Sequence, residues 1–163
     1  MKLIPHATTG AAVGSLVAWG WNEPLAIPLG VAAAVLPDVD HIFDFYWHYV
    51  RRSRKRLFIL FHGWEFVILL HLYQFFDHSW WASTISLGYA SQIILDQIGN
   101  NAKWNTYIFS WRAWNRFRRF ESYGKDSPGF YKAFTQSVPW LGPKMEPWFK
   151  QRDKEMYPEV YSD

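Results

Sequence analysis

The sequence RRSRKRLFILFHGWEFVILLHLYQFF, residues 51–76, joins a strongly basic run to an apolar segment without Lys or Arg. The apolar part, Leu57–Phe76, is twenty residues long. A helix of that length, at a rise of about 1.5 Å per residue, matches the hydrocarbon core of a bilayer. Polar residues, among them His62 and Glu65, interrupt the segment. The stretch therefore predicts a helix at membrane depth that carries functional side chains.

Four apolar segments occur in all, at residues 11–21, 25–36, 57–76 and 80–98. Short polar turns such as Asn22-Glu23-Pro24 and Asp77-His78-Ser79 separate them. No alternation of period two indicates a β-strand. The sequence therefore predicts an all-α protein in which residues 1–102 form a four-helix up-down bundle.

The basic residues are distributed very unevenly. Residues 57–102 contain no Lys or Arg, whereas residues 51–56 contain five and residues 103–163 contain eleven. If four helices cross a bilayer, every Lys and Arg lies on one side, which is the positive-inside pattern. We therefore expect an inner-membrane protein with both termini in the cytoplasm. The first two segments have about 12–15 apolar residues against the ~20 of a full span, so a soluble helical protein is the alternative.

The remainder of the chain, residues 103–163, has a different composition. The segment KWNTYIFSWRAWNRFRRF, residues 103–120, alternates aromatic residues with arginine and predicts an amphipathic helix at the membrane surface. Beside an apolar bundle, anionic lipid headgroups are the expected partners rather than nucleic acid. The arginines expected to contact these headgroups are Arg112, Arg116, Arg118 and Arg119. The Pro- and Gly-containing sequence that follows predicts an irregular tail with short helical pieces, packed on the bundle or on the membrane surface.

Composition excludes several kinds of functional site. The chain has no cysteine, which excludes a disulfide scaffold, a zinc finger, an iron–sulfur cluster and a thiol nucleophile. The sequence also offers no phosphate-binding loop, no dinucleotide fingerprint and no recognisable Ser-His-Asp arrangement. Any chemistry must therefore come from histidines and carboxylates.

The polar residues of the apolar segments fall at matching ends of the expected helices. In an up-down bundle, the start of the first and third helices and the end of the second and fourth share one end of the bundle. We therefore expect these side chains to converge. They are His6, Asp38, Asp40, His41, His62, Glu65, Gln92 and Asp96.

The carboxylates of this group suggest a metal ion. A carboxylate in an apolar segment loses hydration worth several kcal/mol unless it is paired or binds a cation. No Lys or Arg lies in these segments. Imidazole and carboxylate without thiolate suit zinc, with manganese or iron as alternatives. The expected metal ligands are His6, Asp38, Asp40, His41, His62, Glu65 and Asp96, and Asp44, one turn after Asp40, is a further candidate.

The same residues carry a resemblance to a known family. The chain resembles the YdjM-type family of inner-membrane-associated, metal-dependent hydrolases, also labelled LexA-binding. That family has an N-terminal His, a PDxDH string, an HRGxTHS string and an H-x-x-x-D pair. Here His6 stands for the first, and PDVDH, residues 37–41, matches the second in full. HGWE, residues 62–65, matches the third in part, and Gln92 and Asp96 stand at the fourth, with Gln in place of His.

The resemblance covers about residues 1–100 and implies a hydrolase. A more distant similarity to zinc-dependent phospholipase C proteins points to phosphoester substrates. A metal-bound water would then attack a small-molecule or lipid ester or phosphoester, with His62 and Glu65 in the catalytic roles and Glu65 as general base if it is not a ligand. The alternatives are a soluble helical hydrolase, or a non-catalytic membrane protein with a structural polar or metal cluster and a lipid- or partner-docking tail.

Overall fold

The computed structural model describes residues 3–100, 102–119, 128–138 and 140–162. Over these residues the chain consists of helices and connecting segments, with no β-strand. One isolated antiparallel bridge joins Arg56 to Arg118. The predicted all-α class is therefore confirmed.

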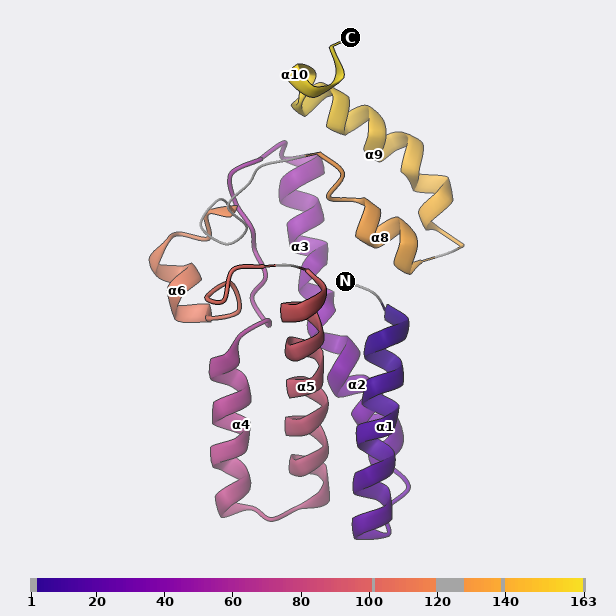
Figure 1. Cartoon of the computed structure of the whole chain (residues 1–163), viewed down its shortest axis with the longest axis vertical. Helices are drawn as coiled ribbons and strands as arrows, with labels where there is room; N and C mark the ends of the chain where they lie inside the picture. The colour runs from indigo at the N-terminus through magenta and orange to yellow at the C-terminus, as the bar shows by residue number, and fades with distance from the viewer. Residues whose placement is uncertain (1–2, 101, 120–127, 139, 163) are drawn as a thin grey trace.

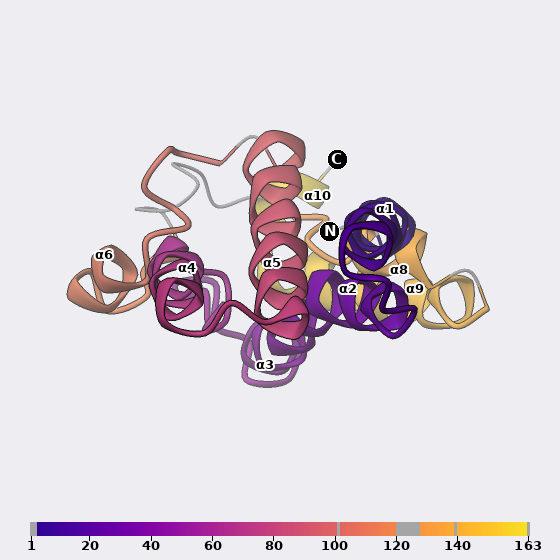
Figure 2. The same cartoon turned by 90° about the horizontal axis from the view of Figure 1, so that it is seen from below.

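Four helices form the apolar half of the molecule and run alternately in opposite directions (Figure 1). They are α1 (Leu3–Trp21), α2 (Ala26–Val35), α4 (Trp64–Phe76) and α5 (Trp80–Gly99). Helices α1, α2 and α5 pack on one another, and α4 packs on the far side of α5 (Figure 2). The four helices thus form an open layer rather than a closed bundle.

Glycines let α1 and α2 approach very closely. Gly10 and Gly14 of α1 are spaced as in the small-xxx-small motifs of membrane helices. A Cβ added at Gly10 would lie 2.5 Å from the carbonyl oxygen of Gly30 in α2, and a Cβ added at Gly88 of α5 would lie 3.0 Å from the same atom. The three helices therefore meet at a junction that has no room for larger side chains. This junction fixes the start of α1 against the end of α2.

The helical path continues beyond α2 instead of ending at Pro37. A 3-10 turn η1 (Leu36–Asp40), the short helix α3 (His41–Phe45) and a π-helical turn η2 (Tyr46–Val50) follow without a break. Pro37 lies in the first turn of η1, where its missing N–H is tolerated. The whole run, Ala26–Val50, is the one helix in the described part of the chain that is long and apolar enough to cross a membrane.

The segment before α4 departs from the sequence prediction. We expected a helix from Leu57, but residues 57–63 are extended and α4 begins at Trp64. The amides of this segment bond elsewhere: the Leu57 N–H donates to the Phe117 carbonyl (2.8 Å), and the Phe61 N–H donates to Asp40 Oδ2 (2.7 Å). Helix α4 has 13 residues. At ~1.5 Å per residue it is too short for a ~30 Å core, so the expected twenty-residue span is wrong.

The predicted amphipathic helix over residues 103–120 is also wrong, although Phe120 lies outside the described residues. In the described part of this segment, the helix α6 (Phe109–Trp114) covers six residues and turns occupy much of the rest. It ends because Arg116 and Phe117 adopt left-handed φ values of 51° and 55°. The next residues instead lie along the basic run, where the Arg119 N–H donates to the Lys55 carbonyl (2.9 Å).

The C-terminal region contains the predicted short helical pieces, and it is more regular than expected because one of its helices has 15 residues. It contains α8 (Lys132–Ser137), α9 (Gly142–Met156) and α10 (Pro158–Tyr161). An aromatic core holds these helices against η2: Tyr49, Tyr131, Phe149, Met156 and Tyr157. The hydroxyl of Tyr49 also accepts a hydrogen bond from the N–H of Tyr131 (2.8 Å). Residues 120–127 of the predicted tail lie outside the described residues.

Candidate metal centre

Helix α1 begins and helix α5 ends at the same end of the apolar layer (Figure 1). Polar side chains from five elements converge there. The contributing elements are α1, η1, α3, the extended segment before α4, and α5. The side chains are buried, and they are His6, Asp38, Asp40, His41, His62, Gln92 and Asp96. The convergence follows from the alternating helix directions, because each of these residues lies at the same end of its helix or in the loop beside it.

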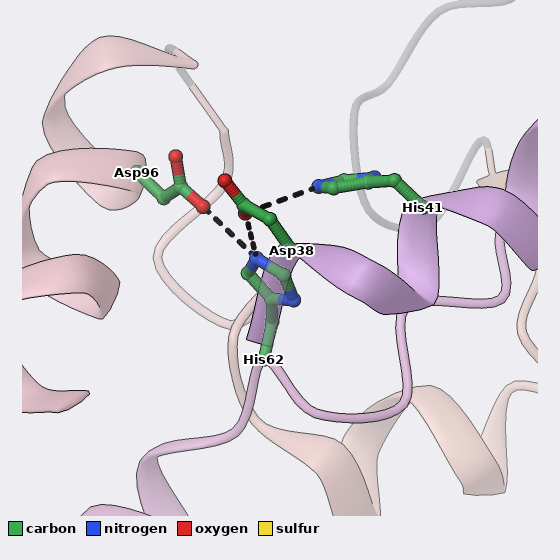
Figure 3. A group of neighbouring side chains, drawn as sticks. All are labelled: Asp38, His41, His62 and Asp96. Carbon is green, nitrogen blue, oxygen red and sulfur yellow. Dashed lines mark hydrogen bonds and ion pairs between the residues drawn. The ribbon is translucent and has the colours of Figure 1, made fainter. Parts of the chain in front are cut away.

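Four of these residues direct donor atoms at one point (Figure 3). Asp38, His41, His62 and Asp96 each offer one ligand atom, and these atoms lie within 4.8 Å of one another. His62 Nε2 is 3.1 Å from Asp38 Oδ1 and 3.1 Å from Asp96 Oδ2. The His41 Nε2 atom lies 3.7 Å from Asp38 Oδ1. Two imidazoles and two carboxylates are a donor set suited to zinc, manganese or iron.

Asp40 orients the ring of His62. Its Oδ2 lies 3.1 Å from His62 Nδ1, while Nε2 on the opposite side of the ring faces the aspartates. Metal-ligating histidines commonly bond a carboxylate through the nitrogen that does not bind metal, which fixes the ring and its tautomer. Asp40 is therefore placed to support a ligand rather than to act as one.

Carboxylates also explain why the segment before α4 is extended. Asp40 accepts the N–H of Phe61 at 2.7 Å, and Asp44 accepts the N–H of Phe58. These bonds give partners to amides of a segment that has no helical hydrogen bonds of its own. They hold the segment beside η1 and α3, so that His62 projects into the cluster. Asp44 thus has a structural contact, and its other oxygen lies 3.9 Å from His41 Nδ1.

The backbone of His62 is held from the other side by an arginine. Arg112 of α6 is 1% exposed, and its Nη2 donates to the carbonyl oxygen of His62. This contact connects the segment after α5 to the cluster. The sequence analysis assigned Arg112 to lipid headgroups, and nothing in its spacing indicated this buried role.

Gln92 lies in the middle of the donor set. Its Nε2 is 3.2 Å from Asp38 Oδ1, 2.7 Å from His62 Nε2 and 2.9 Å from Asp96 Oδ2. Its Oε1 is buried and has no hydrogen-bond partner among the described residues. Oxygen and nitrogen of an amide are interchangeable by a 180° rotation. That rotation would turn an oxygen ligand toward the donor atoms of the other side chains.

Burial and charge act in opposite directions on His62. Burial disfavours its charged form, but hydrogen bonds to Asp38, Asp40 and Asp96 raise the pKa of His62 well above its ordinary value. The same carboxylates would attract a divalent cation, which binds the deprotonated ring and brings more charge to these atoms.

Several buried polar atoms of the cluster have no hydrogen-bond partner among the described residues: Asp38 Oδ2, Asp40 Oδ1, His41 Nε2 and Gln92 Oε1. An unsatisfied buried polar atom costs about 1–3 kcal/mol. Oxygen and imidazole nitrogen atoms are also what a divalent cation binds. The residues present therefore fit a metal ion.

The structure does not bring Glu65, expected as a ligand or general base, into the cluster. Its carboxylate lies at the start of α6, where it accepts the N–H groups of Phe109 and Ser110, each at 2.8 Å, and the Ser110 hydroxyl at 2.8 Å. Burial raises the pKa of Glu65, but these donors outweigh it and leave the pKa below its ordinary value. The residue caps a helix, and the HGWE string gave no sign of this role.

The four arginines expected at lipid headgroups divide into two pairs. Arg112 and Arg119 are buried, the first against His62 and the second with its Nη1 3.2 Å from His48 Nδ1. Arg116 and Arg118 are exposed. Two of the four are therefore available to an anionic surface.

Comparison with known proteins gives one match. A family model described as YdjM inner membrane protein matches residues 1–109. These residues include the apolar helices and every side chain of the cluster. The chain matches no curated protein and no solved structure, and the similarity to zinc-dependent phospholipase C proteins stays a prediction.

Proposed function

This chain belongs to the family of YdjM inner membrane proteins, and on that premise we propose that it is a metal-dependent hydrolase of the inner membrane. It holds a divalent ion at the cytoplasmic end of its apolar helices and cleaves an ester or phosphoester with a metal-activated water. Zinc is the expected ion, with manganese or iron as alternatives.

The observation that carries this proposal is the buried donor set Asp38, His41, His62 and Asp96. The carboxylates of this set contact histidines and Gln92, and they form no ion pair with a described Lys or Arg. Buried carboxylates without a cation are strongly destabilising. A bound metal is the partner that removes this cost with the fewest additional assumptions.

Four residues of the cluster have a defined part in the proposed chemistry. A divalent ion lowers the pKa of bound water toward 7 and so supplies a nucleophile at neutral pH. Asp40 keeps His62 Nε2 directed at the ion, and Asp38 and Asp96 supply negative oxygen ligands from η1 and α5. Because the Glu65 carboxylate binds the start of α6 and not the cluster, a carboxylate that already contacts the cluster would accept the proton from the attacking water.

Exposed apolar side chains on the helices support a membrane location independently of the family. Large apolar side chains on the helices are highly exposed, for example Trp19 at 86% and Phe76 at 88%. Exposed apolar patches of this kind mark surfaces that contact a membrane or a partner. The exposed Arg116 and Arg118 lie near the cluster end, on the segment that pairs with the basic run. We propose that this end faces anionic headgroups on the cytoplasmic side, with both termini in the cytoplasm.

The test uses the full chain purified in detergent. We expect it to contain zinc, manganese or iron after mild purification, and to show a higher thermal midpoint when one of these ions is added to stripped protein. His62→Ala should abolish the shift. His78→Ala, which changes an exposed histidine at the opposite end of α5, should keep it. Absence of metal, with no shift in the unmodified protein, would remove the proposed chemistry.

Hydrolysis is tested separately on the metal-loaded protein with chromogenic ester and phosphoester substrates. Turnover should disappear in Asp38→Asn and persist in His78→Ala. A protein that binds metal tightly but turns over no ester would instead be the non-catalytic alternative. The position of Gln92 favours that alternative. Its amide donates hydrogen bonds to Asp38 and Asp96, as it would in a structural network without metal.

A further inference from the structure

Asp38 and Asp96 each present their two carboxylate oxygens to two different imidazole rings. Asp38 Oδ1 lies 3.1 Å from His62 Nε2, and its Oδ2 lies 3.9 Å from His6 Nε2. Asp96 repeats the arrangement, with Oδ2 3.1 Å from His62 Nε2 and Oδ1 3.2 Å from His6 Nε2. The two carboxylates therefore lie between His62 on one side and His6 on the other.

His6 is not one of the four residues whose donor atoms lie within 4.8 Å of one another. Its ring is 2% exposed, and its Nδ1 has no hydrogen-bond partner in the part of the chain that the structure describes. Its Nε2 faces only the outer oxygens of Asp38 and Asp96. Asp38 Oδ2 in turn has no hydrogen-bond partner among described residues. Buried polar groups without partners are costly, so these atoms point to a second bound cation.

Charge leads to the same conclusion. Four buried carboxylates lie at this end of the molecule, those of Asp38, Asp40, Asp44 and Asp96. They contact histidines, backbone amides and Gln92. One divalent ion compensates half of their charge, whereas two ions compensate all of it.

We propose that the site holds two divalent ions bridged by Asp38 and Asp96. The first is bound by His41, His62 and the inner oxygens of the two aspartates, and the second by His6 and their outer oxygens. This inference rests on the proposed metal site and assigns His6, a ligand expected from the sequence, to a second ion. Two-ion centres bridged in this way place the ions about 3.5–4 Å apart.

The two-ion arrangement specifies the substrate class. Paired ions at that separation bind the attacking and the leaving oxygens of a phosphoryl group undergoing in-line displacement. With one ion the carboxylates would keep a net negative charge and repel a phosphate, while with two ions their charge is balanced. We therefore assign a phosphoester as the substrate class, because the two-ion arrangement suits the attacking and leaving oxygens of a phosphoryl group.

The experiment counts ions in the full chain in detergent, stripped of metal and reloaded with Mn²⁺. We expect two equivalents per chain by elemental analysis, and an electron paramagnetic resonance spectrum of exchange-coupled rather than isolated Mn²⁺. His6→Ala should bind one equivalent and lose the coupled spectrum. His62→Ala should bind less than one equivalent, and the control His78→Ala should keep two.

The outcomes separate this inference from the proposed function. One equivalent in both the unmodified chain and His6→Ala would overturn the second position and leave the first intact. No bound Mn²⁺ in the unmodified chain would overturn both. The coupled spectrum of the unmodified chain shows whether a second ion is bound, even if His6→Ala does not fold. Inorganic phosphate should change that spectrum, and an unchanged spectrum would overturn the phosphoester assignment.

Discussion

The ring of His62 lies between two carboxylates of the same helical turn, with Nδ1 3.1 Å from Asp40 and Nε2 3.1 Å from Asp38. Asp40 and His62 are separated by 22 positions in the sequence. Their contact determines the direction of the ring and makes Nε2 the atom available to a cation. The extended segment before α4 is required for this contact, because a helix beginning at Leu57 would bond its own amides and place His62 differently.

Asp40→Asn should weaken metal binding by roughly 10- to 100-fold, because outer partners of ligating histidines have effects of that size. The amide oxygen can still accept hydrogen bonds from Phe61 N–H and His62 Nδ1–H, but it lacks the negative charge that makes a metal-bound imidazole a stronger ligand. Chelator competition with Zn²⁺ measures the change. The control is Asp77→Asn at the opposite end of α4. Unaltered affinity in Asp40→Asn would show that the ring is oriented by something other than this contact.

Glu65→Gln should destabilise the fold by about 1–2 kcal/mol at neutral pH, because charged acceptors of amide hydrogen bonds contribute somewhat more than neutral ones. The pKa of Glu65 lies below its ordinary value of 4.5. Its contribution is therefore complete above about that pH and is lost as the pH falls through the lowered pKa. Thermal midpoints of the two proteins should converge in acid.

The role assigned to Glu65 has a second readout. If the residue is structural, Glu65→Gln should leave the amount of bound metal unchanged. Loss of metal at full stability would instead restore Glu65 to the site. Glu159 near the C-terminus, whose side chain is 55% exposed, supplies the matched control Glu159→Gln, with little effect on either measurement.

Gly10→Ala should separate α1 from α2. The new Cβ would lie 2.5 Å from the Gly30 carbonyl oxygen and 2.8 Å from the Cβ of Ala34. Overpacking of this kind costs typically ~1–3 kcal/mol, and the shift of α1 should also weaken metal binding through His6. Gly20→Ala in the same helix meets nothing within 4 Å and should stabilise by roughly 0.5–1 kcal/mol. Equal melting of the two variants in detergent would contradict the close packing.

Gln92→His should tighten zinc binding by on the order of tenfold, which corresponds to about 1.4 kcal/mol. An imidazole at this position adds a nitrogen ligand that zinc prefers to an amide. Isothermal titration of stripped protein measures the affinity. Gln92→Leu, similar in volume but without polar atoms, should bind zinc more weakly than the unmodified chain. Weaker binding in Gln92→His would mean that the position is too crowded for a ligand.

The positions of the cluster residues could be predicted from helix direction alone. His6, Asp38, His62 and Asp96 lie at ends of apolar segments, and antiparallel segments bring alternate ends together whatever the details of packing. The prediction failed for Glu65, since it assumed one helix through residues 62 and 65. Gly63 adopts an extended conformation between them, and the two side chains diverge.

The failures in the second half of the chain have a related cause. The spacing of aromatic residues and arginines in residues 103–120 suits a helix, but the chain there bonds to the basic run and to His62. Likewise Tyr49 and Phe149 are far apart in sequence, yet they pack together and stabilise α9. Such partners lie outside any local window, so periodicity cannot identify them.

By itself the sequence determined the helical class, the family and the group of residues from which a cation site could be built. These depend on local properties: apolar periodicity, the absence of Lys and Arg over residues 57–102, and the spacing of PDVDH. Tertiary structure alone decided which carboxylates face a shared point and which bind backbone amides. Asp38, Asp40, Asp44 and Glu65 are chemically near-equivalent, and their different roles follow from the donors that long-range packing places within about 3 Å of each.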